Sequence, residues 1–288
     1  MSAGHSSDHL RARRAGTEWP LRLLSGFALA VVAVSAVALQ PEIMAALLAL
    51  MCLFAAREWH RMVRTVPPPR GMTHLQTAVT GLAIAAAIAA TLWQAAWAGF
   101  LLLVAGAAAA FLLARQRGDN APWHALGVLY IGVPALALMA LRLVSGLNGS
   151  LVVMGLFLIV WSTDTGALLV GRLVGGPKLA PAISPGKTWA GTIGGSVAAA
   201  LVYGLYIAMI GQAAAPAALF ALVFSIAAHL GDLLESVFKR RFGTKDTGGL
   251  IPGHGGALDR MDSTLVAAPV LAVLVFALGF NPLFGGPW

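Results

Sequence analysis

The chain consists largely of long apolar stretches, and nine of them approach the length needed to cross a lipid bilayer. A spanning helix needs about 20 apolar residues. The stretches cover roughly residues 21–39, 43–62, 73–92, 94–114, 125–144, 151–171, 189–210, 216–236 and 263–280. Backbone polar groups in lipid must be satisfied within their own segment, so such stretches form helices. The sequence therefore predicts an all-α, polytopic membrane bundle of about nine transmembrane helices.

The composition supports a membrane location. Of the 288 residues, 59% are hydrophobic and only 10% are charged, whereas about a quarter of the residues in a soluble domain are charged. Basic residues of membrane proteins gather in cytoplasmic loops. The formal net charge of +8 is therefore explained by the topology and gives no reason to expect a nucleic-acid partner. The single cysteine, Cys52, lies in an apolar stretch and excludes an intramolecular disulfide.

The basic residues are distributed unevenly among the loops. The chain has 19 Lys and Arg residues. Eighteen of them precede or open the first apolar stretch, or come at the end of or after the second, fourth, sixth or eighth stretch. Arg142 is the exception. Because cytoplasmic loops are enriched in Lys and Arg, this pattern predicts a cytoplasmic N-terminus. It also favours nine helices over eight, an alternative that arises because only Trp93 and Gln94 separate the third and fourth stretches. Cleavage of the first stretch after Ala38, as a signal peptide, is a less favoured alternative.

The two halves of the chain differ in polarity. Residues 1–18 predict a cytosolic tail, and residues 19–124 predict a transmembrane scaffold with few ionisable groups in its spans. Residues 125–288 predict a catalytic transmembrane domain with cytosolic polar loops. Four ionisable residues lie in or at the ends of its apolar stretches: Asp164, His229, Asp232 and Glu235. Since such groups are costly in lipid, each marks a functional hypothesis.

The segment 236–262 is the most polar part of the chain. It holds five basic residues, Lys239, Arg240, Arg241, Lys245 and Arg260, and three acidic ones, Asp246, Asp259 and Asp262. Cations and glycine-rich backbone, here Gly255 and Gly256 beside His254, can hold phosphate oxygens, and carboxylates can hold a metal. The segment therefore predicts a site for a metal-bound polyphosphate, with a merely tight loop as the alternative.

Helical spacing relates this segment to the end of the eighth stretch. His229, Asp232, Ser236 and Lys239 follow steps of three and four residues and share one helical face. We expect Asp232 and Asp259 to bind a divalent cation, while Asp262 orients Arg260 or caps the ninth helix. The alternative is a structural ion pair of Lys239 with Asp232 or Glu235.

A second polar segment lies between the sixth and seventh stretches. Ser184, Lys187 and Thr188 precede an apolar stretch, so they are expected at a helix N-terminus, which favours phosphate binding. Gly186-Lys187-Thr188 imitates the end of a P-loop, but Pro181 stands where that motif needs glycine. A soluble nucleotide-hydrolysing fold is therefore excluded.

Both polar segments resemble the signature motifs of phosphatidate cytidylyltransferases, also called CDP-diacylglycerol synthases. The matching residues of the longer motif are Ser236, Lys239, Arg240, Lys245, Asp246, Pro252, His254, Gly255, Gly256, Asp259, Arg260 and Asp262. The shorter motif matches at Ile183, Ser184, Pro185, Lys187, Thr188 and Trp189, but Ala190 replaces the family's usual Glu. The resemblance covers roughly residues 125–280.

The resemblance implies transfer of the cytidylyl group of CTP to phosphatidate at the cytoplasmic face of the inner (plasma) membrane. It implies Mg²⁺ as cofactor, and it leaves open a second, monovalent cation and a homodimer. Asp232, Lys239 and Asp259 are the expected catalytic residues. The expected substrate-binding residues are Ser184, Lys187, Thr188, Arg240, Lys245, Asp246, His254, Gly255, Gly256, Arg260 and Asp262.

Other membrane functions remain as alternatives. A polyprenol kinase or an archaeal-lipid cytidylyltransferase would share the general chemistry, although the complete motif favours phosphatidate. A secondary transporter would also be polytopic with buried acids. Transporters place such groups near the bilayer midplane, often in paired halves, whereas here they gather toward one rim of one half.

Overall fold

The computed structural model describes residues 26, 28, 30–67, 74–145, 148–248, 255–283 and 286–287. Residues 30–38 are helical and belong to the first predicted span. The long helices that follow are α2 (Pro41–Val63), α3 (Leu75–Leu92), α4 (Ala96–Gln116), α5 (Ala121–Arg142), α6 (Gly149–Leu173), α7 (Trp189–Met209), α8 (Ala214–Arg241) and α9 (Leu258–Phe276). The predicted tail, residues 1–18, lies outside the described residues.

The all-α membrane architecture is confirmed. Within the described ranges, the seven helices α2 to α8 are long and apolar enough to cross a membrane. Helix α9 has 19 residues and begins with Asp259, Arg260 and Asp262, five residues before the predicted start. Helices α3 and α4 are separate because Gln94 adopts a left-handed backbone conformation, with φ of 61°, between them. Two spans therefore occupy this region, as the nine-helix prediction requires.

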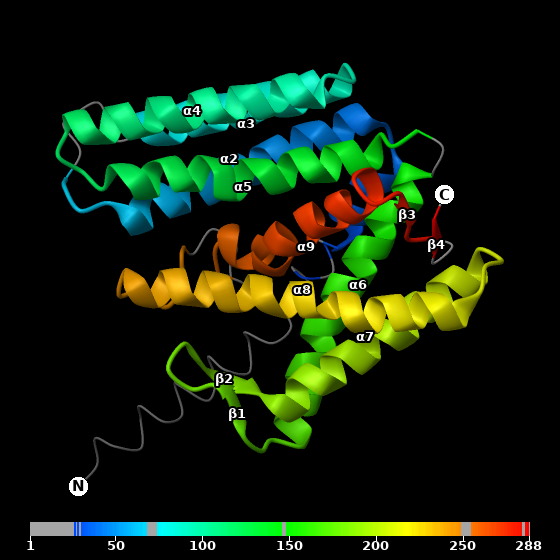
Figure 1. Cartoon of the computed structure of the whole chain (residues 1–288). Helices are drawn as coiled ribbons and strands as arrows, with labels where there is room; N and C mark the ends of the chain where they lie inside the picture. The colour runs from blue at the N-terminus through cyan, green and yellow to red at the C-terminus, as the bar shows by residue number, and fades with distance from the viewer. Residues whose placement is uncertain are drawn as a thin grey trace, which may run out of the picture.

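The helices form two groups that meet at α9 (Figure 1). In the first group, α4 packs between α3 and α5, and α2 packs against α3 and α5. In the second group, α7 packs against α6 and α8. Helix α9 contacts both α5 and α8, so it joins the two groups. The predicted domain boundary between residues 124 and 125 falls inside α5 and stays a prediction.

Small residues, among them Gly191 and Gly195, allow close packing of α6 and α7. A Cβ atom on Gly195 would lie 2.5 Å from the Thr163 carbonyl oxygen. One on Gly191 would lie 2.7 Å from the Ala167 oxygen. Both distances are shorter than van der Waals contact, so the two helices approach as closely as glycine permits.

Two short hairpins complete the fold. Strand β1 (Lys178–Ala180) pairs antiparallel with β2 (Ser184–Thr188), and β3 (Phe280–Asn281) pairs with β4 (Gly286–Pro287). Ser184 and Lys187 therefore lie on a strand, not on the first turn of a helix. The prediction of a helix N-terminus is correct only at Thr188, which caps α7 by accepting a hydrogen bond from the Gly191 amide at 3.1 Å.

The polar loops collect at one end of the bundle (Figure 1). The C-terminal ends of α2, α4 and α8, the β1–β2 hairpin and the start of α9 all lie toward this end. Arg142, the exception in the basic pattern, lies at the opposite end of α5 and donates to the Val37 and Leu39 carbonyl oxygens at 3.1 and 2.8 Å. The structure therefore agrees with the alternation of basic and apolar segments in the sequence.

Candidate functional site

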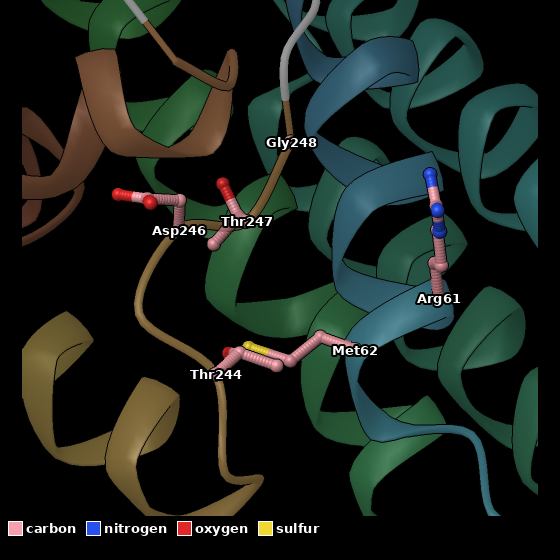
Figure 2. Close-up of a pocket in the computed structure, with 6 residues that line it drawn as sticks. All are labelled: Arg61, Met62, Thr244, Asp246, Thr247 and Gly248. Atoms are coloured by element: carbon pink, nitrogen blue, oxygen red, sulfur yellow. The ribbon is translucent and has the colours of Figure 1, made fainter. Parts of the chain in front are cut away.

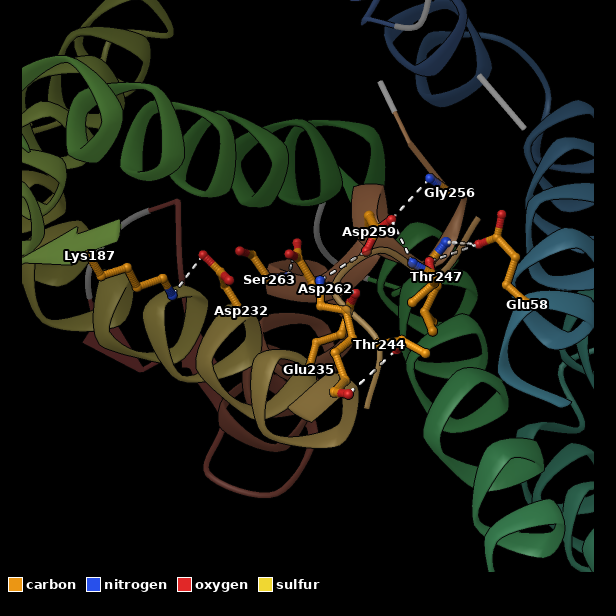
Figure 3. A network of polar contacts seen from close by, with 12 residues as sticks. Glu58, Lys187, Asp232, Glu235, Thr244, Thr247, Gly256, Asp259, Asp262 and Ser263 are labelled. Carbon is orange, nitrogen blue, oxygen red and sulfur yellow. Dashed lines mark hydrogen bonds and ion pairs between the residues drawn. The ribbon is translucent and has the colours of Figure 1, made fainter. Parts of the chain in front are cut away.

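Polar side chains from five separate parts of the chain meet where α8 ends and α9 begins. Figure 3 shows the network extending from Lys187 on the β1–β2 hairpin, across α8 and α9, to Glu58 on α2. Helix α6 contributes Asp164, whose carboxylate accepts a hydrogen bond from Ser263 at 3.2 Å. The most polar motifs of the sequence are thus brought together in three dimensions.

The hairpin places a cation beside the carboxylate of α8. Lys187 Nζ lies 2.7 Å from Asp232 Oδ2, and the two side chains are 18% and 32% exposed. The hairpin is also held to α8 because Arg240 Nε donates to the Ile183 carbonyl oxygen at 3.1 Å. Two predicted substrate-binding residues, Lys187 and Arg240, therefore join the two polar segments of the chain.

Three carboxylates, Asp164, Asp232 and Asp262, are close enough to repel one another electrostatically. Helix α6, helix α8 and the first turns of α9 supply one each. The close approach of α8 to α9 at Gly231 brings them together, because a Cβ there would lie 2.6 Å from the Asp262 carbonyl oxygen. This concentration of negative charge favours a bound cation.

Lys239 forms a second ionic cluster one to two turns further along α8. Its ammonium group lies 3.1 Å from Glu235 Oε1 and 2.9 Å from Asp259 Oδ1. The alternative of an ion pair between Glu235 and Lys239 is thus realised. Glu235 is fully buried, so the lysine compensates a carboxylate that would otherwise be costly in this position.

Asp259 also holds the glycine-rich segment. Its Oδ2 accepts hydrogen bonds from the Gly256 amide at 3.0 Å and the Thr247 amide at 3.3 Å. Together with Lys239 on Oδ1, these donors engage both carboxylate oxygens. Its predicted role as a metal ligand stays a prediction, and an ion there would have to displace one of these contacts.

Glu58 of α2 is a member of the network that sequence reasoning missed. It is 7% exposed, and its Oε2 accepts hydrogen bonds from the Leu258 amide at 2.9 Å and the Thr247 hydroxyl at 3.3 Å. The assignment of residues 19–124 to a scaffold stays a prediction, but at Glu58 this part of the chain contacts the polar network directly. The available signal was an acidic residue within an apolar stretch, which alone marks a functional hypothesis.

Aromatic side chains fix α2 and α5 against the end of α8. Trp59 packs edge-on against Phe238 with ring centroids 5.3 Å apart, and Trp123 packs against Phe242 at 5.0 Å. The Trp59 indole also donates to the Trp123 carbonyl oxygen at 2.8 Å. These contacts determine where Glu58, the neighbour of Trp59, enters the site.

Tyr130 of α5 faces the same cluster. Its hydroxyl is buried and has no hydrogen-bond partner among the described residues. The Tyr130 hydroxyl lies close enough to the carboxylates of Glu235, Asp262 and Asp232 to interact with them electrostatically. A buried hydroxyl group without a partner is costly, so this side chain is a candidate for contact with a bound substrate.

A cavity of about 410 Å³ lies beside the network (Figure 2). Helix α2 borders one side and the segment after α8 the other. Its lining residues are Arg61, Met62, Thr244, Asp246, Thr247 and Gly248. Asp246, a predicted substrate-binding residue, therefore lies next to the site, and it is exposed, as is Lys245.

The remaining predicted residues differ in their surroundings. Arg260 is exposed at the start of α9 and interacts electrostatically with Asp164. His229 packs rather than binds, since its Nε2 contacts the Thr192 carbonyl oxygen at 3.1 Å. His254 lies outside the described residues. Gly255 adopts a φ of +83°, which residues with a side chain rarely adopt.

The donor set suits a divalent cation that shares its ligands with a substrate. Within the described part of the chain, no three His, Cys, Asp or Glu side chains are arranged to hold a metal ion on their own. Mg²⁺ commonly takes one or two carboxylates and completes its shell with phosphate oxygens and water. Asp232, with Asp164 and Asp262 beside it, supplies carboxylates of this kind. The Lys187 ammonium lies 2.7 Å from Asp232 Oδ2, so an ion there would have to share or displace that contact.

Comparison with known proteins agrees with this chemistry. The model of the cytidylyltransferase family matches residues 20–278. The chain is 48% identical over 184 residues to a phosphatidate cytidylyltransferase from Brucella suis, an alignment that covers 62% of this chain and 66% of the relative. It is 40% identical over 168 residues to the Staphylococcus haemolyticus enzyme of the same name, covering 55% of this chain and 60% of that protein.

The alignments with these relatives thus cover slightly less than two thirds of the relatives' own length. The family model, in contrast, extends over nearly the whole chain and includes both polar segments and all the helices from α2 to α9. On this evidence the chain belongs to the cytidylyltransferase family.

Proposed function

We propose that this protein transfers the cytidylyl group of CTP to phosphatidate, giving CDP-diacylglycerol and pyrophosphate. The observation that carries the proposal is the convergence of the two polar motifs, through Lys187 and Asp232 at 2.7 Å, at one end of an apolar helical bundle. A water-soluble triphosphate needs a site rich in cations and metal-binding carboxylates. A diacyl lipid needs that site to open at the depth of the lipid headgroups.

The reaction requires one bond to form and one to break. A phosphate oxygen of the lipid bonds to the α-phosphorus of CTP, and the bond from that phosphorus to the oxygen bridging to the β-phosphorus breaks. Pyrophosphate then leaves with the electron pair. Such transfers depend mainly on positioning and on neutralising the phosphate charge. Lys187, Arg260 and Lys245 are the cationic side chains that we assign to this task.

The proposed cofactor is Mg²⁺, held by Asp232 together with Asp262 or Asp164 and by the phosphates of CTP. When bound, the ion would polarise phosphate oxygens and offset their charge. Lys239 bridges Glu235 on α8 and Asp259 on α9, and in this way it keeps the start of α9 in place. Tyr130 can donate its hydroxyl proton in a hydrogen bond to a substrate oxygen.

We also propose that the active site faces the cytoplasm at the inner (plasma) membrane. The distribution of basic residues supports this orientation, because 18 of the 19 lie before or at the start of the first span, or toward the ends of alternate spans and in the segments that connect these ends. CTP is a charged solute that does not cross the bilayer unaided, so the cytoplasmic face is where the site can reach it.

The experiment is a direct assay of the purified protein in detergent–lipid micelles. Labelled CTP, phosphatidate and Mg²⁺ should give CDP-diacylglycerol and pyrophosphate in equal amounts. An Asp232→Asn variant of equal thermal stability serves as the inactive control. Formation of a phosphorylated polyprenol, or no lipid product with phosphatidate, would refute the proposal.

A further inference from the structure

We propose that Glu58 is a positioning residue of the proposed active site. It holds Thr247 and Leu258, the two ends of the glycine-rich segment, in the positions that nucleotide binding requires. This inference rests on the proposed function for its catalytic consequence. Its structural basis does not depend on that function. The residue lies on α2, in the part of the chain that the sequence assigns to scaffold.

A single carboxylate oxygen of Glu58 connects the two ends of the segment. It accepts from the Thr247 hydroxyl at one end and from the Leu258 amide at the other, at 3.3 and 2.9 Å. The Leu258 amide is one of the donors at the start of α9 that has no partner within its own helix. Glu58 therefore caps α9 from a different helix and ties the segment to it at the same time.

Asp259 holds the same segment from the other side. Its Oδ2 also reaches both ends, through the Thr247 and Gly256 amides at 3.3 and 3.0 Å. Thr247 is thus bound by two carboxylates at once, through its hydroxyl and its amide. The carboxylates of Glu58 and Asp259 therefore restrain both ends of the segment at Thr247 and at the start of α9.

Two glycines make room for Glu58. A Cβ on Gly248 would lie 2.4 Å from its Oε1, and one on Gly256 would lie 2.5 Å from its Oε2. Both separations are too short for any other residue without a shift of the carboxylate. A side chain at Gly248 or Gly256 would therefore displace the Glu58 carboxylate, and at Gly256 also the Thr247 hydroxyl at 2.4 Å.

The position of Glu58 is itself well determined. Its neighbour Trp59 is fully buried and packs against Tyr130 and Phe238, with ring centroids 5.2 and 5.3 Å away. Gly127 of α5 accommodates the indole, because a Cβ there would lie 2.2 Å from it. The carboxylate is therefore held on a rigid helix face and is suited to fix a loop.

The test compares Glu58→Gln, Thr247→Ala and the double variant with the wild type. Glu42→Gln is the matched control, because Glu42 is an exposed carboxylate on the same helix. We would measure kcat/KM for CTP, KM for phosphatidate, the midpoint of thermal unfolding, and hydrogen exchange of backbone amides in residues 247–258. The exchange measurement needs no catalytic activity.

For Glu58→Gln we expect kcat/KM for CTP to fall at least about tenfold, KM for phosphatidate to stay within about twofold, and exchange in residues 247–258 to accelerate. Thr247→Ala should change the same quantities less. The double variant should be no worse than Glu58→Gln, since the two residues share one hydrogen bond. Glu42→Gln should match the wild type.

Unchanged exchange in Glu58→Gln, or faster exchange with kcat/KM for CTP within twofold of the wild type, would overturn the inference. If Glu58→Gln does not fold, Thr247→Ala tests the same contact. A wild-type protein without cytidylyl transfer would refute the proposed function, and the exchange data would still decide the role of Glu58.

Discussion

Replacement of Gly231 by alanine tests whether the close contact of α8 with α9 assembles the carboxylate cluster. The added Cβ would lie 2.6 Å from the Asp262 carbonyl oxygen and 2.9 Å from the Ser263 Cα, both of them backbone atoms that cannot rotate away. Ordinary contact begins near 3.4 Å, so the helices must separate locally by about 0.8 Å. That shift moves Asp262, and with it the spacing to Asp232 on the neighbouring helix.

The expected cost has two parts. Overpacking of this kind destabilises a protein by about 1–3 kcal/mol. A misplacement of about 1 Å in an active site lowers turnover by up to about a hundredfold. We therefore expect Gly231→Ala to fold, to unfold at a lower temperature in detergent, and to lose about ten- to a hundredfold in CDP-diacylglycerol formation.

The control is Gly204→Ala at the contact of α7 with α8. There the added Cβ would lie 3.2 Å from the Ala218 methyl group, which requires an adjustment of only a few tenths of an ångström. The activity of both variants should be measured well below their unfolding temperatures. If Gly231→Ala retains activity within twofold of the wild type and the same unfolding temperature, the contact does not assemble the site and the reasoning is wrong.

Five further predictions concern the site and its orientation in the membrane. Asp232→Asn should lower turnover at least about a hundredfold and raise the Mg²⁺ concentration needed for half-maximal activity. Asp259→Asn should lower turnover by a comparable factor and leave the Mg²⁺ concentration for half-maximal activity unchanged, because its carboxylate holds Lys239 and two backbone amides. A higher Mg²⁺ requirement would instead identify Asp259 as a metal ligand. Tyr130→Phe should reduce activity about tenfold without loss of thermal stability, because its hydroxyl has no partner among the described residues; a lower unfolding temperature would contradict this. Ala190→Glu should fold and keep activity within about threefold; failure to fold would show that the first turn of α7 is packed differently from the family pattern. Single cysteines placed in residues 172–188 and 239–248 of a Cys52→Ala background should be labelled only from the cytoplasmic side, and labelling from outside intact cells would refute the site model.

The sequence determined the architecture because lipid leaves few alternatives. A long apolar stretch in a bilayer satisfies its backbone only as a helix, so the spans follow from hydropathy, and their alternation follows from the basic residues. The polar motifs were equally easy to identify in the sequence, since Asp232, Lys239 and Asp259 are charged residues in a largely apolar chain. The family resemblance implies that they are catalytic residues, and these roles stay predictions.

The partners of those residues depended on tertiary structure. Sequence spacing placed Asp232 near Lys239 on one helical face, but the hairpin after α6 brings Lys187 to Asp232. Lys239 pairs with Glu235, as the alternative from the sequence allowed, and also with Asp259 of α9, which helical spacing could not indicate. Helical periodicity reports which side chains share a face and says nothing about which other element packs against that face. The β1–β2 hairpin itself was not predicted, because its strands are only three and five residues long.

Glu58 shows the same limit most clearly. It is separated by about 200 residues of sequence from the Leu258 amide that it binds, and no local pattern relates the two. The apolar character of α2 determined that this segment is a membrane helix. Only the packing of Trp59 against α5 and α8 decided that the adjoining carboxylate would enter the polar network, because a contact between distant segments is fixed by how their side chains fit together in three dimensions.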